Sequence, residues 1–322
     1  MTVTVAICTW NRCESLRTTL EQFCSLRIPA RTDWELLVVN NNCTDATDPV
    51  VASFQGRLPV RLLHEPTPGQ SYARNLALRE ARGEYLMWTD DDVNVDPGWM
   101  QSLLAPLADR TASWSFGPSA PQWPGKPPSW YSERFRNYFA VLDYGPHSFR
   151  ITNYLQPFYG LNFAGTVESH RALGGFRNEF GFKGDVGGVG EDIDLFQRAF
   201  DARMPIVYCP SALVHHVIPE ARTRKAYHRR RHWVANQVYY TVLAEMFPKG
   251  PWVLGLPRFF FAHAAIDTRA CLRSLITGQR SDAFYYELRL VRFVRLLLEA
   301  ARNGFRRPAV LSIGTVKESI GS

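Results

Sequence analysis

Three consecutive aspartates, Asp90, Asp91 and Asp92, follow an apolar run at residues 85–88. Ionised carboxylates at the end of a buried strand cost free energy unless a positive charge lies beside them. Hard divalent cations such as Mg²⁺ and Mn²⁺ bind carboxylate oxygens and commonly take further oxygens from a substrate phosphate. A metal bound together with a phosphorylated ligand would satisfy this triplet. The alternative is a solvated acidic turn or a cap on the next helix.

A second acidic pair, Glu191 and Asp192, opens the segment GEDIDLFQRAF, whose pattern predicts a helix. Negative charge is favourable at a helix N-terminus, so simple capping would also explain the pair. Residues two positions apart do not share a helix face, and we therefore expect Asp194 to point away from Asp192. Glycines before the helix predict a mobile loop, and they are Gly184, Gly187, Gly188 and Gly190.

Alternating strand-like and helix-like segments would position these acids. Strands are predicted at residues 2–8, 34–40, 60–65 and 84–89, and helices at residues 12–26, 45–54, 71–81 and 97–107. This alternation with short connections is typical of a parallel α/β sheet covered on both faces. The continuous apolar strands fit that burial. Pro97 stands where the first turn of the last of these helices is expected.

Polar residues collect where the predicted strands end. Ligands bind at the carboxyl ends of strands in parallel α/β sheets, and a shared ligand explains this clustering. The residues are Thr9, Asn11, Asn40, Asn41, Asn42 and the aspartate triplet. Further along, residues 111–165 are rich in Pro, Trp and Tyr and predict a loop-rich region. The segment PIVYCPSALVHH predicts one more strand, which ends in His215 and His216.

Taken in order, six segments resemble the family 2 glycosyltransferases of the GT-A fold, over roughly residues 2–220. They are VAICTWNR, LLVVNNNCTDAT, PGQSYARNLALREARGEYLMWTDDDV, GLNFAGTVESHRALGGF, GEDIDLFQRAF and ALVHH. One position departs from the family pattern. The family commonly has Asp at the end of its second strand, where it is associated with the nucleotide base, and this chain has Asn40. An Asn carbonyl can still accept a hydrogen bond, so the resemblance leaves the base less defined.

The resemblance implies a metal site and a donor site. Asp90 and Asp92 match the DXD motif, which binds Mn²⁺ or Mg²⁺, with Asp92 as the first choice for direct ligand and His216 preferred over His215 as a further one. The metal would offset the charge that builds on the leaving nucleotide diphosphate. The donor is expected to be a UDP-sugar. The residues that would contact it are Thr9, Asn11, Arg12, Asn40, Asn42, Arg74, Asp90 and Asp91; for Arg74 the alternative is a surface arginine on a helix.

The resemblance also implies an inverting reaction, in which a base deprotonates the acceptor hydroxyl as it attacks the sugar. Asp192 occupies the position that the family uses for this base, and Glu191 beside it would orient the acceptor. The expected acceptor is a glycan or a lipid-linked sugar, in polysaccharide or glycolipid biosynthesis.

Charge divides the chain into two parts. The net charge is +7, but residues 217–322 carry +11 and residues 1–216 carry −4. We expect a GT-A domain at 1–220, with a nucleotide-sugar half at 1–110 and an acceptor half at 111–220, followed by a basic helical extension at 221–322. The basic run RTRKAYHRRRHW has no accompanying nucleic-acid motif, so no nucleic-acid partner is expected.

The extension contains an apolar helix that begins near residue 282. Its arginines, Arg289, Arg292, Arg295 and Arg302, fall within roughly 140° of arc at about 100° per residue. An apolar face with a basic flank predicts a helix on an anionic membrane surface. The alternative is a helix that packs on its own domain or on a second subunit.

Neither a signal peptide nor an uncharged apolar run of about 18 residues is evident, and the six cysteines match no zinc spacing. We therefore expect a reduced cytoplasmic protein, peripheral on the inner face of the plasma membrane. A haloacid-type phosphatase is one alternative, but its motif requires Thr or Val two residues after the second Asp, where this chain has Asn94. A non-catalytic, membrane-bound scaffold is the other, and the intact Asp90, Asp92 and Asp192 argue against it.

Overall fold

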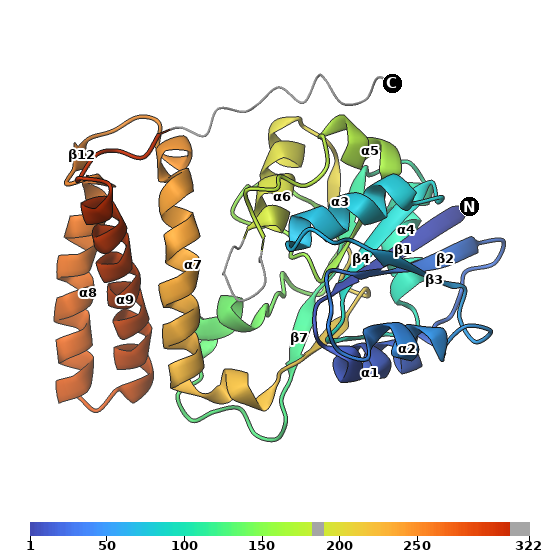
Figure 1. Ribbon diagram of the computed structural model, residues 1–322, viewed down its shortest axis with the longest axis horizontal. Coiled ribbons are helices and arrows are strands. Elements are labelled where there is room, and N and C mark those ends of the chain that lie inside the picture. Colours follow the sequence, from blue (N-terminus) through green and yellow to red (C-terminus); the bar gives the residue numbers. More distant parts are fainter. Residues whose placement is uncertain (182–189, 310–322) are drawn as a thin grey trace. The chain divides into compact units, whose positions relative to one another are not determined.

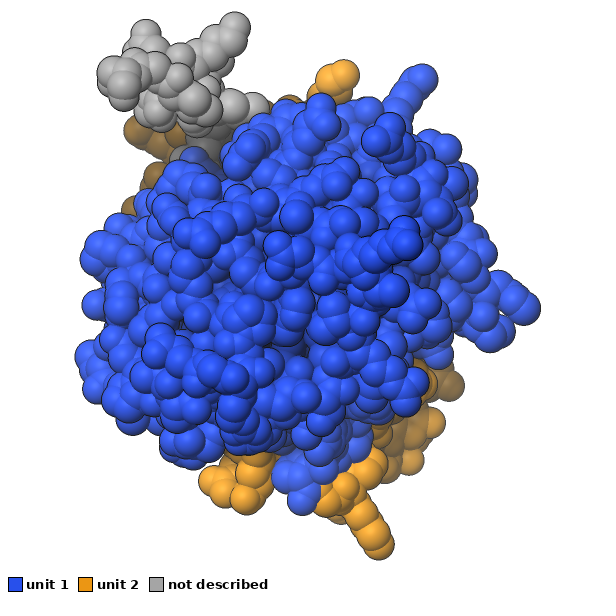
Figure 2. All heavy atoms as spheres, turned by 90° about the vertical axis from the view of Figure 1, so that its right-hand side faces the viewer, with its two compact units in different colours: residues 1–124, 136–184, 190–218 blue, residues 125–135, 185–189, 219–322 orange. Residues whose placement is uncertain are grey.

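The computed structural model describes residues 1–181 and 190–309, apart from the side chains at positions 237, 238, 241, 242, 245 and 246. The chain divides into two compact units, which Figure 2 colours separately. Within the described residues, unit 1 comprises residues 1–124, 136–181 and 190–218, and unit 2 comprises residues 125–135 and 219–309.

The first half of the chain alternates strands and helices, as the sequence predicts. Its elements are β1 (Thr2–Thr9), α1 (Cys13–Phe23), β2 (Asp33–Asn40), α2 (Thr47–Ala52), β3 (Val60–His64), α3 (Gln70–Glu80), β4 (Tyr85–Asp90), β5 (Val93–Val95), α4 (Trp99–Ala108), β6 (Trp114–Phe116) and β7 (Ser119–Gln122). The elements that follow, up to the end of unit 1, are η1 (Glu133–Phe139), β8 (Phe149–Arg150), β9 (Asn162–Thr166), α5 (Val167–Ala172), α6 (Glu191–Asp201), β10 (Ile206–Tyr208) and β11 (Val214–Val217).

Unit 1 is organised by a large sheet with the strand order β3-β2-β1-β4-β9-β6-β10-β8. Strands β1 to β4 are parallel, and β9 runs antiparallel to both β4 and β6. The sheet is therefore mainly parallel, with a reversed strand, β9, near its centre. Its strands β1 to β4 are labelled in Figure 1. A smaller sheet, in the order β5-β11-β7, begins directly after the aspartate triplet.

Two apolar layers bury the large sheet. On one side, alternate β1 residues such as Val5 pack with α1, α2 and α4, for example with Leu16 and Leu103. On the other side, Ala6 and Trp88 pack with α3 and α6, which contribute Ala77 and Leu195. Burial on both faces explains why the strand sequences are continuously apolar.

Two local predictions were wrong. Helix α4 begins at Trp99, so Pro97 lies in the turn before it; the carboxylate of Asp96 accepts a hydrogen bond from Gly98 N–H at 2.8 Å, and this closes a turn ahead of the helix. The segment at 205–216 forms two strands, β10 and β11, that belong to different sheets. Pro210 follows β10 directly after Cys209, and a proline cannot donate the backbone hydrogen bond that a continuing strand needs.

Unit 2 is mainly helical. Its elements are η2 (Glu220–Thr223), α7 (Lys225–Met246), β12 (Trp252–Val253), β13 (Leu256–Pro257), α8 (Phe259–Ile276) and α9 (Arg280–Arg302). The core of the unit includes Leu243, Leu256 and Leu296. Trp130 is also buried, and its indole N–H donates to the Thr223 carbonyl at 2.9 Å. Among the described residues, no helix is both long and apolar enough to cross a bilayer.

All four arginines predicted to flank a membrane-bound face of α9 have partners within unit 2, and three of them contact α7 or α8; Arg302 is exposed and pairs with Glu299 of its own helix at 2.8 Å. Arg289 pairs with Asp267 of α8 at 2.8 Å. Arg292 lies over the Tyr239 ring of α7 at 4.3 Å, and Arg295 lies over the Trp233 ring at 5.1 Å. These contacts match the packing alternative for α9, because they place the arginine face against the unit's own helices.

Candidate active site

The aspartate triplet lies at the carboxyl edge of the sheet, between β1 and β4. These two strands are adjacent and parallel, with Cys8 opposite Asp90. After β1 the chain turns toward β2, and β4 lies on the other side, so the strand order reverses at this point. Crevices of this kind are the usual ligand sites of open α/β sheets.

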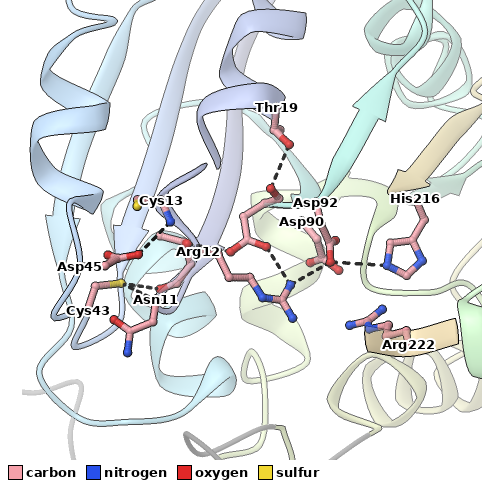
Figure 3. A network of polar contacts seen from close by, with 12 residues as sticks. Asn11, Arg12, Cys13, Thr19, Cys43, Asp45, Asp90, Asp92, His216 and Arg222 are labelled. Atoms are coloured by element: carbon pink, nitrogen blue, oxygen red, sulfur yellow. Dashed lines mark hydrogen bonds and ion pairs between the residues drawn. The ribbon is translucent and has the colours of Figure 1, made fainter. Parts of the chain in front are cut away.

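Arg12 neutralises two of the three aspartates. One guanidinium nitrogen, Nη1, lies 3.1 Å from Asp91 Oδ1 and 2.8 Å from Asp92 Oδ2. Figure 3 shows the Arg12 side chain pointing toward Asp92. Thr9 Oγ1 also donates to Asp91 Oδ2 at 2.7 Å, and Thr19 Oγ1 donates to the Asp91 backbone carbonyl at 3.0 Å. Both carboxylates are buried, and these partners offset the free energy that burial of a carboxylate costs.

His216 reaches the same carboxylate from the smaller sheet. The β5–β11 register pairs His216 with Val93, which places its imidazole Nε2 3.5 Å from Asp92 Oδ2. Its Nδ1 lies 2.8 Å from the Phe139 carbonyl, which can only accept, so Nδ1 carries the proton. In the neutral ring, Nε2 then turns a lone pair toward Asp92. His215, one residue earlier, is exposed.

This arrangement fits a cation between Asp92 and His216. Two neighbouring ligands of an octahedral ion at about 2.1 Å lie about 3 Å apart, close to the observed 3.5 Å. In the part of the chain that the structure describes, no three His, Cys, Asp or Glu side chains gather closely enough to hold a metal unaided. Water or the oxygens of a bound ligand would fill the other positions around an ion here, as is usual for Mg²⁺.

Arg74 joins the triplet to the second acidic pair. It is 2% exposed, with Nη2 3.6 Å from Asp90 Oδ1 and Nη1 3.3 Å from Glu191 Oε1. Its guanidinium also lies 5.2 Å from the Phe176 ring centroid. Nη2 donates to the Gly160 carbonyl at 3.3 Å, and a Cβ at Gly160 would lie only 2.4 Å from Nη2. Arg74 is thus a buried bridge, and the surface alternative for it was wrong.

Glu191 and Asp192 open α6 but differ in their surroundings. Glu191 is buried against Arg74. Asp192 is half-buried, and its Oδ2 accepts a hydrogen bond from Gly160 N–H at 2.6 Å. Asp194 instead pairs with Arg198 at 2.6 Å, so the expectation that it points away from Asp192 is confirmed.

Gly190 precedes α6 in a left-handed conformation with φ 98°. Of the glycines expected to form a mobile loop, it alone belongs to the described residues; Gly184, Gly187 and Gly188 lie outside them.

Burial shifts the titration of these acids. It raises the pKa of Glu191 from 4.5 to about 7, with Asp192 adding to the shift and Arg74 opposing it. The pKa of Asp90 and of Asp91 is also raised, again mainly by burial. A site that holds so many carboxylates against their desolvation cost is a typical functional site.

Removing the Glu191 carboxyl should change how stability depends on pH. The folded chain binds the Glu191 proton more tightly than the unfolded chain does, so this group lowers stability as pH rises from about 4.5 to about 7. We expect the melting temperature of Glu191→Gln, relative to that of the wild type, to rise by several degrees as the pH is raised from about 5 to about 8. Paired thermal melts check this, and a gap that does not change with pH would contradict the raised pKa.

The loops predicted to hold the nucleotide are tied to one another. Asn11 has φ 52° and accepts a hydrogen bond from Thr44 N–H at 2.7 Å. Asn40 accepts from Cys43 N–H through its Oδ1 at 2.7 Å, so its carbonyl already has a donor. Asn42 is exposed and has φ 62°. All three residues lie at the same sheet edge: Asn40 ends β2, and Asn11 and Asn42 lie in the loops that follow β1 and β2.

Sequence reasoning missed several residues that shape the site. Asp48 accepts from Asn40 Nδ2 at 2.6 Å and lies 2.7 Å from His64 Nε2, so the Asn40 position has a carboxylate beside it. Gly160 holds Asp192 through its backbone and leaves room for Arg74. Neither contact is local in sequence. The sequence offered one indication, the glycine at position 160 just before β9. A glycine at such a place often marks a close approach of another part of the chain.

Comparison with known proteins agrees with the architecture. The sequence profile of Glycosyl transferase family 2 matches residues 4–166. The succinoglycan biosynthesis protein ExoM of Rhizobium meliloti is 27% identical over 247 residues, which cover 76% of this chain and 75% of ExoM.

Two solved structures share the fold. The mannosyltransferase PcManGT of Pyrobaculum calidifontis, in complex with GDP-Man and Mn²⁺, has a TM-score of 0.58 at 21% identity, covering 94% of this chain and 86% of that one. TarS 1-349 of S. aureus, in complex with UDP-GlcNAc, has a TM-score of 0.56 at 14% identity and covers 94% and 92%.

Proposed function

The chain belongs to glycosyl transferase family 2 and is a glycosyltransferase of the GT-A fold, and from this premise we propose an inverting, metal-dependent transfer from a nucleotide-sugar. Family membership excludes the haloacid-type phosphatase as an alternative. The intact acidic residues Asp90, Asp92 and Asp192 argue equally against a scaffold without catalysis.

One observation carries the proposal. Arg74 contacts Asp90 with one guanidinium nitrogen and Glu191 with the other. It thereby holds the strand end proposed for the donor next to the helix start proposed for the acceptor. Transfer requires the donor sugar and the acceptor hydroxyl to meet in one crevice, and this bridge brings the two groups of acids to the same place.

We assign the donor diphosphate and a Mn²⁺ or Mg²⁺ ion to the side of the crevice with Asp90, Asp92 and His216. When bound there, the ion would offset negative charge on the leaving diphosphate. The chain's own contribution is to hold its ligands. Arg12 orients the Asp92 carboxylate, and the Phe139 carbonyl fixes the tautomer of His216. The proposed donor-contacting residues at the ends of β1 and β2 and in the loops after them are Thr9, Asn11, Arg12, Asn40 and Asn42. Asp91 pairs with Arg12.

Asp192 is our candidate for the base. Its Oδ2 is held by Gly160 N–H and its Oδ1 by Ile193 N–H at 2.8 Å, so the carboxylate is fixed in one orientation. A positioned carboxylate that is open on one side can take a proton from an acceptor hydroxyl. Glu191 is buried against Arg74, and we assign it a positioning role beside the base.

We propose a UDP-sugar as donor and a glycan or lipid-linked sugar as acceptor. The UDP-GlcNAc complex of TarS supports the first, although PcManGT binds GDP-Man within the same fold. The name of ExoM, a succinoglycan biosynthesis protein, supports a role in making a polysaccharide.

Donor hydrolysis in the absence of acceptor tests the proposal. UDP-sugars and GDP-sugars are incubated separately with the full chain and Mn²⁺, and released nucleoside diphosphate is measured. We expect slow release from a UDP-sugar, which stops when EDTA removes the metal. Release only from GDP-sugars would contradict the choice of uridine as the nucleoside of the donor. Release that EDTA leaves unchanged would contradict the metal dependence.

A further inference from the structure

Helix α8 carries apolar side chains on its solvent side. Its outward residues recur every three or four positions and are therefore on one side of the helix. Among them, Ile266 is 59% exposed, Leu272 is 55% exposed and Ile276 is 86% exposed. The solvent side of a surface helix normally carries polar and charged residues. We call this set the α8 stripe: Ala262, Ala265, Ile266, Arg269, Leu272, Arg273 and Ile276.

The charges of the α8 stripe are positive. Arg269 and Arg273 lie within it, and Arg280 is the first residue of α9; all three are exposed. The carboxylates of α8 and α9 are each paired with another arginine of unit 2, because Asp267 pairs with Arg289, Asp282 with Arg134, Glu287 with Arg229, and Glu299 with Arg295. These carboxylates therefore do not neutralise the positive charge of Arg269 and Arg273.

We propose that the α8 stripe docks on an anionic lipid surface. Exposed apolar side chains next to arginines are the chemistry that places a helix in the interface of a bilayer, with the apolar groups among the acyl chains and the cations at the headgroups. The surface differs from the face of α9 suggested by sequence, where Arg289, Arg292 and Arg295 contact α7 and α8.

Charge distinguishes a lipid from a second copy of the chain. A two-fold interface would place the same patch on both partners. Arg269 and Arg273 of one copy would then face the same residues of the other, and like charges would repel. Anionic headgroups complement the arginines and leave the apolar residues a place to bury.

Vesicle flotation with the full chain tests the proposal. We expect the wild-type chain to float with vesicles that contain phosphatidylglycerol, to stay behind with phosphatidylcholine alone, and to bind less tightly as salt rises. Arg269→Gln with Arg273→Gln should lower the partition coefficient about 30-fold, since each basic residue near an anionic surface contributes a few-fold to tenfold. Leu272→Ser with Ile276→Ser should lower it at least about tenfold.

A matched control is available on unit 1. Leu155 is 67% exposed and Arg171 is also exposed, so Leu155→Ser with Arg171→Gln removes one apolar and one basic group elsewhere and should leave flotation unchanged. Circular dichroism checks that every variant is folded. The proposal is overturned if both α8 variants float like the wild type, or if the wild type ignores the anionic vesicles. It is also overturned if light scattering shows a dimer that Leu272→Ser with Ile276→Ser dissociates.

Discussion

Asp192→Asn should transfer sugar about 10²- to 10⁴-fold more slowly than the wild type, since positioned bases typically contribute that much, or roughly 3 to 5 kcal/mol of barrier. The amide keeps the size of the side chain, and its carbonyl oxygen can still accept from Gly160 N–H. It cannot take the acceptor proton at neutral pH. Donor affinity should change little, because the proposed donor ligands lie on the Asp90–Asp92 side. Initial transfer rates measured beside donor-binding titrations separate the two effects.

Glu191→Gln is the neighbouring control for this experiment. It removes a carboxylate of the same helix turn that faces Arg74 rather than the open side. We expect it to retain far more activity than Asp192→Asn. A fall in turnover confined to Glu191→Gln would move the base by one residue, and equal losses of donor binding and transfer in Asp192→Asn would indicate a structural cap.

Asp92→Ala should abolish the divalent-dependent part of donor binding, a loss of about 100-fold or more, because removing one member of a buried charge cluster commonly costs several kcal/mol. The variant should stay folded, since Arg12 keeps Asp91 as a partner. Calorimetric titration of the UDP-sugar with and without Mn²⁺ measures the effect. Affinity in Mn²⁺ that equals the wild-type value would remove Asp92 from the metal site.

His216→Ala and His215→Ala form a matched pair for the same site. His216 lies 3.5 Å from Asp92 and His215 is exposed. Donor binding should therefore lose its Mn²⁺ dependence in His216→Ala and keep it in His215→Ala. The opposite order would exclude His216 as a ligand.

The early strands were predictable because each is a continuous apolar run that ends in polar residues. Val5, Leu37 and Trp88 all fall in such runs and are buried in the sheet. The position of β9 was not predictable, because Asn162–Thr166 pairs with strands on both sides that are distant in sequence. Strand pairing of this kind depends on packing across the whole unit, and no local pattern encodes it.

The acids of the site were evident from sequence, but their partners were not. Arg74 lies on a helix whose sequence looks solvent-facing, and its burial follows from carboxylates contributed by β4 and α6. The support that Gly160 gives to Asp192 comes from a backbone N–H, which every residue except proline offers. Side-chain type predicts which chemistry is present, whereas tertiary contacts decide which group is exposed to a ligand.

The reversed strand at the centre of the sheet limits how this enzyme can be divided or recombined. Strand β4 carries the aspartates, and it hydrogen-bonds to β9 along Tyr85–Thr89. A fragment that ended near residue 110 would leave that edge unpaired and apolar, which is a template for aggregation. The proposed donor half at residues 1–110 and acceptor half at residues 111–220 therefore cannot be exchanged as independent units between enzymes. A chimaera that changes acceptor choice would need to keep β9 with its own β4 and graft only loops between them.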